Sequence, residues 1–310
     1  MRRVQYHRYG GPDVLTLDDV DTPTPGRGQV LVRVRAAAAN AMDWKMRNGD
    51  MRAMTGRRFP RGVGHDFAGV VAALGEGVTR LQVGDEVLGG ALFKQAGAFA
   101  DYTLADEHGV ARKPDELTFT QAATLPVVGL TAYQALLKVG RLQSGQNVFV
   151  NGCLGGAGRI AVQVATGLGA HVAGSCRSGS EAEARQLGVE TVVAFDLDPA
   201  PLARRYDVVF DTAGTLPYAT ARRMLKPGGK IVDIVPTLGK FVRSGLPGPY
   251  TAFMGKPDAD DLQHVADAAE RGDIAVHIQR TVSLPDAIPA LTELENAPTS
   301  SAGKLVITTD

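Results

Sequence analysis

The sequence of 310 residues is poor in cysteine and in aromatic side chains, and it has no excess charge of either sign. Two cysteines, Cys153 and Cys176, leave no room for a framework of several disulfides and are typical of a reducing compartment. Lysine and arginine number 33, as do aspartate and glutamate, so no basic stripe points to nucleic acid. No apolar run is long enough to cross a membrane, and the N-terminus has no secretory core. We therefore expect a cytoplasmic protein that binds neither nucleic acid nor membrane.

What the sequence does contain is a glycine-rich turn between an apolar strand and an amphipathic helix. Residues 147–158 read NVFVNGCLGGAG, and a helical pattern follows directly. A helix that starts in this way directs its free N–H groups and its positive dipole end towards the turn, which suits a pyrophosphate. The expected contacts are Gly155, Gly156 and Gly158, because a residue without Cβ lets the phosphate approach the backbone. The strand-like segment 169–175 completes a βαβ unit, so the sequence predicts a dinucleotide site rather than an ordinary strand–helix turn.

The end of that second strand indicates which dinucleotide is bound. Sites for NAD usually carry Asp or Glu there, to accept hydrogen bonds from the ribose 2′-hydroxyl. Here the chain reads Ser175, Cys176, Arg177 and Ser178, with no acidic residue before Glu181. An arginine flanked by hydroxyl groups would bind a 2′-phosphate through charge-assisted hydrogen bonds. We therefore predict NADPH as the cofactor, bound by Ser175, Arg177 and Ser178; the alternative is that Arg177 is a solvated loop residue.

The chain changes character near Thr120. Before this residue, short strands alternate with glycine turns, as in a compact β-rich domain. From residue 147 onward, strands alternate with helices, which predicts an α/β domain with a doubly wound parallel sheet of the Rossmann type. Within it we expect a loop over 236–249 and an edge strand over 250–254. An amphipathic helix is expected over 258–271.

Eight short stretches, in this order along the chain, carry a family resemblance. They are NAMDWK (40–45), GHDFAGVV (64–71), VGDEV (83–87), LPVVGLTAY (125–133), the glycine turn, DVVFD (207–211), LKPGG (225–229) and GKLV (303–306). Together they resemble the medium-chain dehydrogenase/reductase superfamily, in its zinc-free quinone oxidoreductase and enoyl reductase branch. The resemblance implies a β-rich, GroES-like catalytic domain over 1–120 and 257–310, a dinucleotide-binding Rossmann domain over 121–256, and a homodimer.

Zinc-binding members of this superfamily need cysteine and histidine ligands at set positions. By resemblance, these positions are Asn40, His65 and Val127 in this chain. One imidazole, an amide and a valine do not supply the three protein ligands of a catalytic Zn²⁺. The four closely spaced cysteines of a structural zinc lobe are also missing from the sequence. The resemblance therefore implies a site without metal, in which His65 is a buried, hydrogen-bonded histidine.

The reaction that the resemblance implies is hydride transfer from NADPH to a quinone or to the β-carbon of an α,β-unsaturated carbonyl compound. Negative charge then develops on the carbonyl oxygen of this small-molecule substrate, and hydrogen-bond donors placed there would stabilise it. Asn40 is the first candidate donor, and Lys45 is the second, either as a donor or as the proton source. The alternatives are an Asn40 that only caps a turn and a Lys45 that is exposed. Trp44 and Tyr133 would line the substrate pocket, unless they pack in the core.

Three further residues are expected to border the cofactor. The resemblance places Thr131 beside the nicotinamide or its ribose. Parallel sheets bind ligands at the carboxyl ends of their strands, which points to Ala213 and Val235. Two other functions stay open: an NADP-dependent alcohol dehydrogenase, which would carry zinc, and an NADPH-binding sensor or scaffold without turnover.

Overall fold

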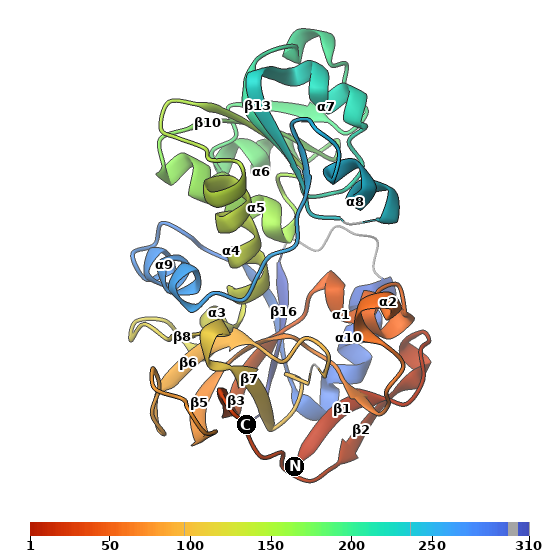
Figure 1. Cartoon of the computed structure of the whole chain (residues 1–310), viewed down its shortest axis with the longest axis vertical. Helices are drawn as coiled ribbons and strands as arrows, with labels where there is room; N and C mark the ends of the chain where they lie inside the picture. Colours follow the sequence, from red (N-terminus) through yellow and green to blue (C-terminus); the bar gives the residue numbers. More distant parts are fainter. Residues whose placement is uncertain (96, 236, 297–302, 310) are drawn as a thin grey trace. The chain divides into compact units, whose positions relative to one another are not determined.

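The structure is a computed structural model that describes residues 1–95, 97–235, 237–296 and 303–309. It divides into two compact units: unit 1 is Met1–Val127, Pro257–Glu270 and Val276–Asp310, and unit 2 is Val128–Lys256 and Arg271–Ala275. In Figure 1, unit 1 therefore combines the red and orange N-terminal elements with the blue α9, α10 and β16. The boundary lies inside helix α4 (Pro126–Tyr133), a little beyond the position at which the sequence changes character.

Unit 1 is built on two sheets. The larger has the order β15-β16-β3-β5-β6-β8, with β7 also paired to β3, and the smaller has the order β2-β1-β4. The strands of the larger sheet are β3 (Gln29–Ala38), β5 (Asp66–Leu74), β6 (Glu86–Gly90), β7 (Tyr102–Asp106), β8 (Val110–Arg112), β15 (Ile278–Ser283) and β16 (Lys304–Thr308). Those of the smaller sheet are β1 (Arg2–Tyr6), β2 (Leu15–Asp19) and β4 (Arg61–Gly62). This confirms the predicted β-rich domain.

Helices and one apolar core complete unit 1. The helices are α1 (Ala41–Asn48), α2 (Arg52–Thr55), α3 (Phe119–Ala123), α9 (Ala259–Glu270) and α10 (Ala287–Asn296), with the 3₁₀ turns η1 (Pro12–Val14), η2 (Glu107–Gly109) and η5 (Leu284–Asp286). The core takes buried side chains from β1, β3, β5, β16 and α10, among other segments, and Phe67 and Phe99 are fully buried in it. Helix α9 places Leu262, Val265 and Ala266 on its buried side, as its amphipathic pattern predicts.

Unit 2 contains one parallel sheet with the order β11-β10-β9-β12-β13-β14. Its strands are β9 (Asn147–Asn151), β10 (His171–Cys176), β11 (Thr191–Ala194), β12 (Tyr206–Asp211), β13 (Leu225–Asp233) and β14 (Tyr250–Ala252). Its helices, besides α4, are η3 (Gln134–Val139), α5 (Gly156–Gly167), α6 (Glu181–Gln186), η4 (Ala200–Leu202), α7 (Tyr218–Met224) and α8 (Leu238–Ser244). Helix α5 packs on β9 and β10, and α7 packs on β12 and β13. The predicted Rossmann-type sheet is confirmed.

One local prediction in unit 2 was wrong, and one strand of its sheet is irregular. The predicted loop over 236–249 contains helix α8, which starts after Thr237, whose hydroxyl accepts the Lys240 N–H at 3.3 Å. Strand β13 starts at Leu225, and its pairing with β12 is irregular between Leu225 and Lys230, where Gly228 has a positive φ of 81°. The edge strand β14 and the helix α9 are each shorter than the predicted ranges 250–254 and 258–271.

Candidate functional site

A buried polar cluster lies in unit 1, where three neighbouring strands meet. In the sheet register, Ala38 of β3 pairs with Asp66 of β5 on one side and with Val306 of β16 on the other. Asn40 is the second residue after β3, and β16 starts at Lys304, so the sheet brings Asn40, Asp66 and Lys304 together. These three side chains are hardly exposed, with Asp66 at 0 %.

The carboxamide of Asn40 joins the other members of this cluster. Its Nδ2 donates to Asp66 Oδ2 at 2.9 Å and to the Ala38 carbonyl at 3.3 Å. Its Oδ1 accepts a hydrogen bond from the ammonium of Lys304, which also donates to the Ala39 carbonyl at 3.3 Å. Asp66 Oδ1 accepts the backbone N–H of Val127 at 3.0 Å. Both ends of the Asn40 amide are therefore engaged within the protein.

A second carboxylate fixes the start of helix α1 at the same place. Asn40 is the residue before α1, and Asp43 Oδ2 accepts its backbone N–H at 2.7 Å. Burial raises the pKa of Asp43 to about 7, with Asp66 adding to the rise. Burial also raises the pKa of Asp66 to about 6, against the opposing effect of the Lys304 ammonium. Desolvation lowers the pKa of Lys304 itself, so the cluster holds opposite charges in a medium that penalises both.

This geometry changes the role expected of Asn40. The prediction made its amide a donor to the substrate oxygen, but its two amide hydrogens point to Asp66 and to the Ala38 carbonyl. Asn40 is instead a positioning residue for α1, which carries the half-buried Trp44 and Lys45. No hydrogen bond or ion pair in the described part of the chain engages the Lys45 ammonium.

The three positions that the resemblance assigns to zinc ligands can be compared with the structure. Asn40 is engaged as described, and Val127 contributes only its backbone N–H to Asp66. His65 is inaccessible at Nδ1, which has no hydrogen-bond partner in the described structure, so the predicted hydrogen bond of this histidine is absent at that atom. Burial lowers the pKa of His65 to about 4, which keeps the ring neutral. Within residues 1–95, 97–235, 237–296 and 303–309, no three His, Cys, Asp or Glu side chains cluster to hold a metal.

In unit 2, the glycine turn leads into the N-terminus of helix α5. The preceding residue, Gly155, caps the helix without a side chain. The N–H groups of Gly156, Ala157 and Gly158 have no hydrogen-bond acceptor among the described residues, as expected for a first helical turn. Gly155 and Gly156 are exposed. The turn therefore has the donors and the open backbone that a pyrophosphate requires.

The glycines of this turn divide into two kinds. A Cβ on Gly158 would lie 2.1 Å from the Gly152 carbonyl oxygen, so this buried glycine lets α5 pack against the turn. Gly152 has a positive φ of 83°, which favours glycine. A Cβ on Gly155 or Gly156 would meet its nearest neighbour at 3.3 or 3.2 Å. The backbone is therefore open at Gly155 and Gly156, whereas Gly158 allows close packing of the helix.

Four adjacent strands of the sheet end in a row of buried polar side chains. In register order, these residues are Ser175 of β10, Asn151 of β9, Asp211 of β12 and Asp233 of β13. Ser175 donates its hydroxyl hydrogen to Asn151 Oδ1 at 2.6 Å, and Asn151 Nδ2 donates to Asp211 Oδ1 at 2.7 Å. Desolvation raises the pKa of Asp211, and the neighbouring Asp233 adds to the rise. The row therefore lies along the carboxyl edge of the sheet, where ligands of this fold bind.

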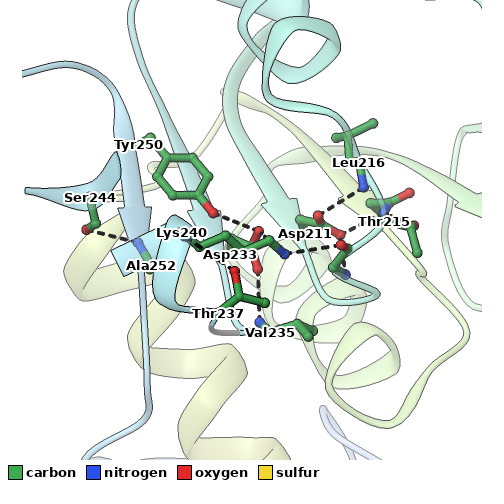
Figure 2. A network of polar contacts seen from close by, with 12 residues as sticks. Asp211, Thr215, Leu216, Asp233, Val235, Thr237, Lys240, Ser244, Tyr250 and Ala252 are labelled. Carbon is green, nitrogen blue, oxygen red and sulfur yellow. Dashed lines mark hydrogen bonds and ion pairs between the residues drawn. The ribbon is translucent and has the colours of Figure 1, made fainter. Parts of the chain in front are cut away.

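Figure 2 shows how the two carboxylates of this row are satisfied. Asp211 accepts the backbone N–H groups of Gly214 and Leu216 at 2.8 and 3.1 Å. Asp233 accepts the Tyr250 hydroxyl at 2.8 Å and pairs with the Lys240 ammonium at 2.8 Å. These bonds fix the loops that follow β12 and β13.

Ala213 and Val235 lie on those two loops. A Cβ on Gly152 would come within 3.2 Å of the Ala213 Cβ, and one on Gly214 would come within 2.5 Å of the Val235 Cβ. Ala213 therefore lies beside the glycine turn, and Val235 lies beside Gly214 on the neighbouring loop. Thr131 and Tyr133 are half-buried on α4, and the Thr131 hydroxyl would lie 3.1 Å from a Cβ on Gly255.

The predicted phosphate-binding residues differ in their surroundings. Ser175 is 0 % exposed, and its hydroxyl accepts the Gly152 N–H at 3.0 Å while it donates to Asn151. We therefore withdraw Ser175 as a phosphate ligand, because its role is to hold the glycine turn. Arg177 and Ser178 are exposed in the turn after β10.

Sequence reasoning missed Lys304 and the Asn151–Asp211–Asp233 row as functional residues. A lysine at the very start of an apolar strand, as in GKLV, was a signal that the sequence offered. Polar residues at the carboxyl ends of apolar strands, as in NVFVN and DVVFD, were a second one.

Two protein-family models match the chain. The model described as the alcohol dehydrogenase GroES-like domain matches residues 26–115, and the one described as zinc-binding dehydrogenase matches residues 185–307. A quinone oxidoreductase from Pseudomonas aeruginosa is 32 % identical over 318 residues, which are 94 % of this chain and 95 % of the relative. A chloroplastic NADPH-dependent alkenal/one oxidoreductase from Arabidopsis thaliana is 35 % identical over 248 residues, which are 76 % of this chain and 62 % of the relative.

Solved structures agree with these relatives. The quinone oxidoreductase from Coxiella burnetii superimposes with a TM-score of 0.89 at 29 % identity, over 100 % of this chain and 99 % of that one. The chain belongs to the quinone oxidoreductase branch of the medium-chain dehydrogenase/reductase superfamily. None of the helices that the structure describes has the length and apolarity needed to cross a membrane.

Proposed function

We propose that this protein is a zinc-independent oxidoreductase that uses NADPH to reduce a quinone or the C=C bond of an α,β-unsaturated carbonyl compound. The observation that carries the proposal is the free N-terminal turn of α5 at the carboxyl edge of the sheet, in a chain of the quinone oxidoreductase family. The bound cofactor would supply the hydride.

The proposed preference for NADPH is supported by the turn after β10. Arg177 and Ser178 are exposed there, and no carboxylate precedes Glu181 to repel a 2′-phosphate. Binding would use Gly155 and Gly156 for the pyrophosphate and Arg177 and Ser178 for the phosphate. The relative from Arabidopsis thaliana, whose name states NADPH dependence, gives independent support.

Zinc independence is supported by the charge of the unit 1 cluster. The Lys304 ammonium donates to Asn40, which takes the position of the first zinc-ligating cysteine. A buried ammonium that donates to the residue at this position would repel a divalent cation bound there. The Asn40 amide is also a poor replacement for a thiolate ligand. The description of one matching family model as zinc-binding therefore fits this chain's fold better than its residues.

The enolate or hydroquinone oxygen needs a donor, and we assign that role to Lys45. It follows Trp44 on α1, whose start is fixed by Asn40 and Asp43. Lys45→Met should lower kcat about tenfold or more and leave the Kd for NADPH unchanged. Lys94→Met, at an exposed lysine outside α1, is the control. Full activity of Lys45→Met would remove Lys45 from the mechanism.

The experiment that tests the proposed function is NADPH consumption against a panel of quinones, enals and enones, with products identified. We expect turnover with at least one compound class and weaker turnover with NADH. NADPH binding without turnover of any compound would favour the sensor or scaffold. Oxidation of alcohols with NADP⁺, together with stoichiometric zinc, would favour the alcohol dehydrogenase. The homodimer and the cytoplasmic location stay predictions.

A further inference from the structure

Unit 2 has a second concave surface at the opposite edge of its sheet. This basic hollow has a volume of about 1150 Å³ and is lined by α7, by the amino-terminal ends of β13 and β14, and by Ala203 and Arg204 shortly before β12. Five of its lining residues are cationic: Arg204, Arg222, Arg223, Lys226 and Lys230. The lining contains no aspartate or glutamate. Because the whole chain has no net charge, the hollow is a strong local concentration of positive charge.

Two of the five cations already have partners. Lys226 pairs with Asp207 at 2.7 Å, and Lys230 donates to the Val139 carbonyl at 3.0 Å. The guanidinium groups of Arg204, Arg222 and Arg223 are exposed and have no hydrogen bond or ion pair with any described residue. Three arginines therefore keep their full donor capacity and repel one another across the same hollow.

The backbone brings these arginines together. Arg222 and Arg223 lie in the last turn of α7, and the Arg204 N–H donates to the Arg223 carbonyl at 2.9 Å. Arg204 has a positive φ of 54°, which is uncommon for a residue other than glycine. Gly228, which also lines the hollow, has open space where a Cβ would lie, so the backbone there is accessible to a ligand.

The hollow is distinct from the cofactor edge. Strand β12 runs from Tyr206 beside the hollow to Asp211 in the polar row. At about 3.3 Å per residue, these two ends are roughly 16 Å apart. Phosphates bound at the glycine turn therefore cannot reach the unpaired arginines, and these arginines take no part in the proposed reaction.

We propose that the basic hollow binds a small polyanion with two or more phosphate groups. Arginine forks match phosphate oxygens in paired hydrogen bonds, and several together select a ligand of multiple charge. The volume suits a nucleotide-sized molecule, whereas an acidic protein or nucleic acid would favour a flatter surface. The assignment does not depend on the proposed reaction.

Calorimetric titration of inorganic tripolyphosphate into the full chain, with NADP⁺ at saturation, tests this proposal. We expect one equivalent to bind beside the filled cofactor site and to raise the melting temperature. Arg222→Gln combined with Arg223→Gln should weaken tripolyphosphate about tenfold or more. Arg205→Gln, an exposed arginine outside the lining, is the matched control and should bind like the parent.

Three results would overturn the proposal. Full displacement of tripolyphosphate by NADP⁺, or loss of its binding in Arg177→Ala, would show that the cofactor site binds it. Equal weakening by Arg205→Gln would reduce the effect to general surface charge. An absence of heat with tripolyphosphate, alongside binding of a DNA duplex, would assign the arginines to a macromolecule.

Discussion

Two buried polar groups, one in each unit, contain similar residue types but differ in what lies beside them. The Asn40–Asp66–Lys304 cluster of unit 1 is closed, because each of its acceptors and the Asn40 amide is engaged within the protein. The Asn151–Asp211–Asp233 row of unit 2 is also satisfied, yet it adjoins a helix N-terminus whose first N–H groups have no acceptor in the described chain. The comparison teaches that a buried polar cluster does not by itself indicate a binding site, whereas open backbone donors at a helix N-terminus beside it favour one.

The largest effect should come from Gly158→Val in the glycine turn. The new side chain would overlap the Gly152 carbonyl oxygen, since even its Cβ would lie 2.1 Å away. We expect a loss of stability of about 4 kcal/mol or more and no detectable NADPH binding. Chemical denaturation and calorimetry measure the two quantities.

Two further glycine substitutions in helix α5 serve as comparisons for Gly158→Val. Gly167→Ala, in the same helix with open space around it, should be neutral or stabilising by about 0.5 kcal/mol. Gly156→Val should fold, because its Cβ meets only a Val128 methyl at 3.2 Å, and should still lose NADPH. Unchanged affinity in Gly156→Val would contradict the pyrophosphate role.

The next effect concerns the closed cluster. Lys304→Met leaves the buried Asp66 carboxylate without its cation, so the free energy of unfolding should fall by about 3 kcal/mol. Adding Asp66→Asn to this variant should recover part of the loss, because no unpaired charge remains. Denaturant unfolding of the parent, both single variants and the double variant measures the coupling. Additive losses would show that the two side chains do not interact.

A smaller effect is expected at the cofactor edge. Arg177→Ala should weaken NADPH about tenfold, because a charge-assisted bond to the 2′-phosphate is lost, and should hardly change NADH affinity. Ser178→Ala should have a smaller effect of the same selectivity. Fluorescence titration with both cofactors checks this. Equal losses for NADPH and NADH would end the phosphate assignment.

The smallest effect is a pH dependence. Burial raises the pKa of Asp43 from 3.8 to about 7, so between these values the folded protein binds a proton that the unfolded chain releases. The free energy of unfolding therefore falls as pH rises through that window. Asp43→Asn removes this titration. Between about pH 4.5 and pH 8, the free energy of unfolding of the variant should therefore rise relative to that of the parent by about 1 kcal/mol or more. The exposed Asp115→Asn serves as control; a gain of the same size there would refute the buried origin.

Much of the fold could be predicted because its signals are local. Strands such as NVFVN and DVVFD are short apolar runs, and the glycine turn between β9 and α5 is a contiguous pattern. Helix α8 was missed because Gly239 and Gly245 suggested a loop, although Thr237 was a usable N-cap signal.

The unit 1 cluster could not be predicted in the same way. Lys304 lies 264 residues from Asn40 in sequence, and only the pairing of β16 with β3 brings them together. The role of Ser175 was mistaken for a similar reason: its hydroxyl faces Asn151 on the neighbouring strand, a contact that sequence spacing does not reveal.

The most direct measurement is NADPH-dependent turnover of the best quinone or enone before and after exhaustive chelation, with metal content determined on the same sample. We predict an unchanged rate and far less than one zinc per chain. A rate that falls with removal of a stoichiometric metal and returns when zinc is restored would contradict metal-free hydride transfer.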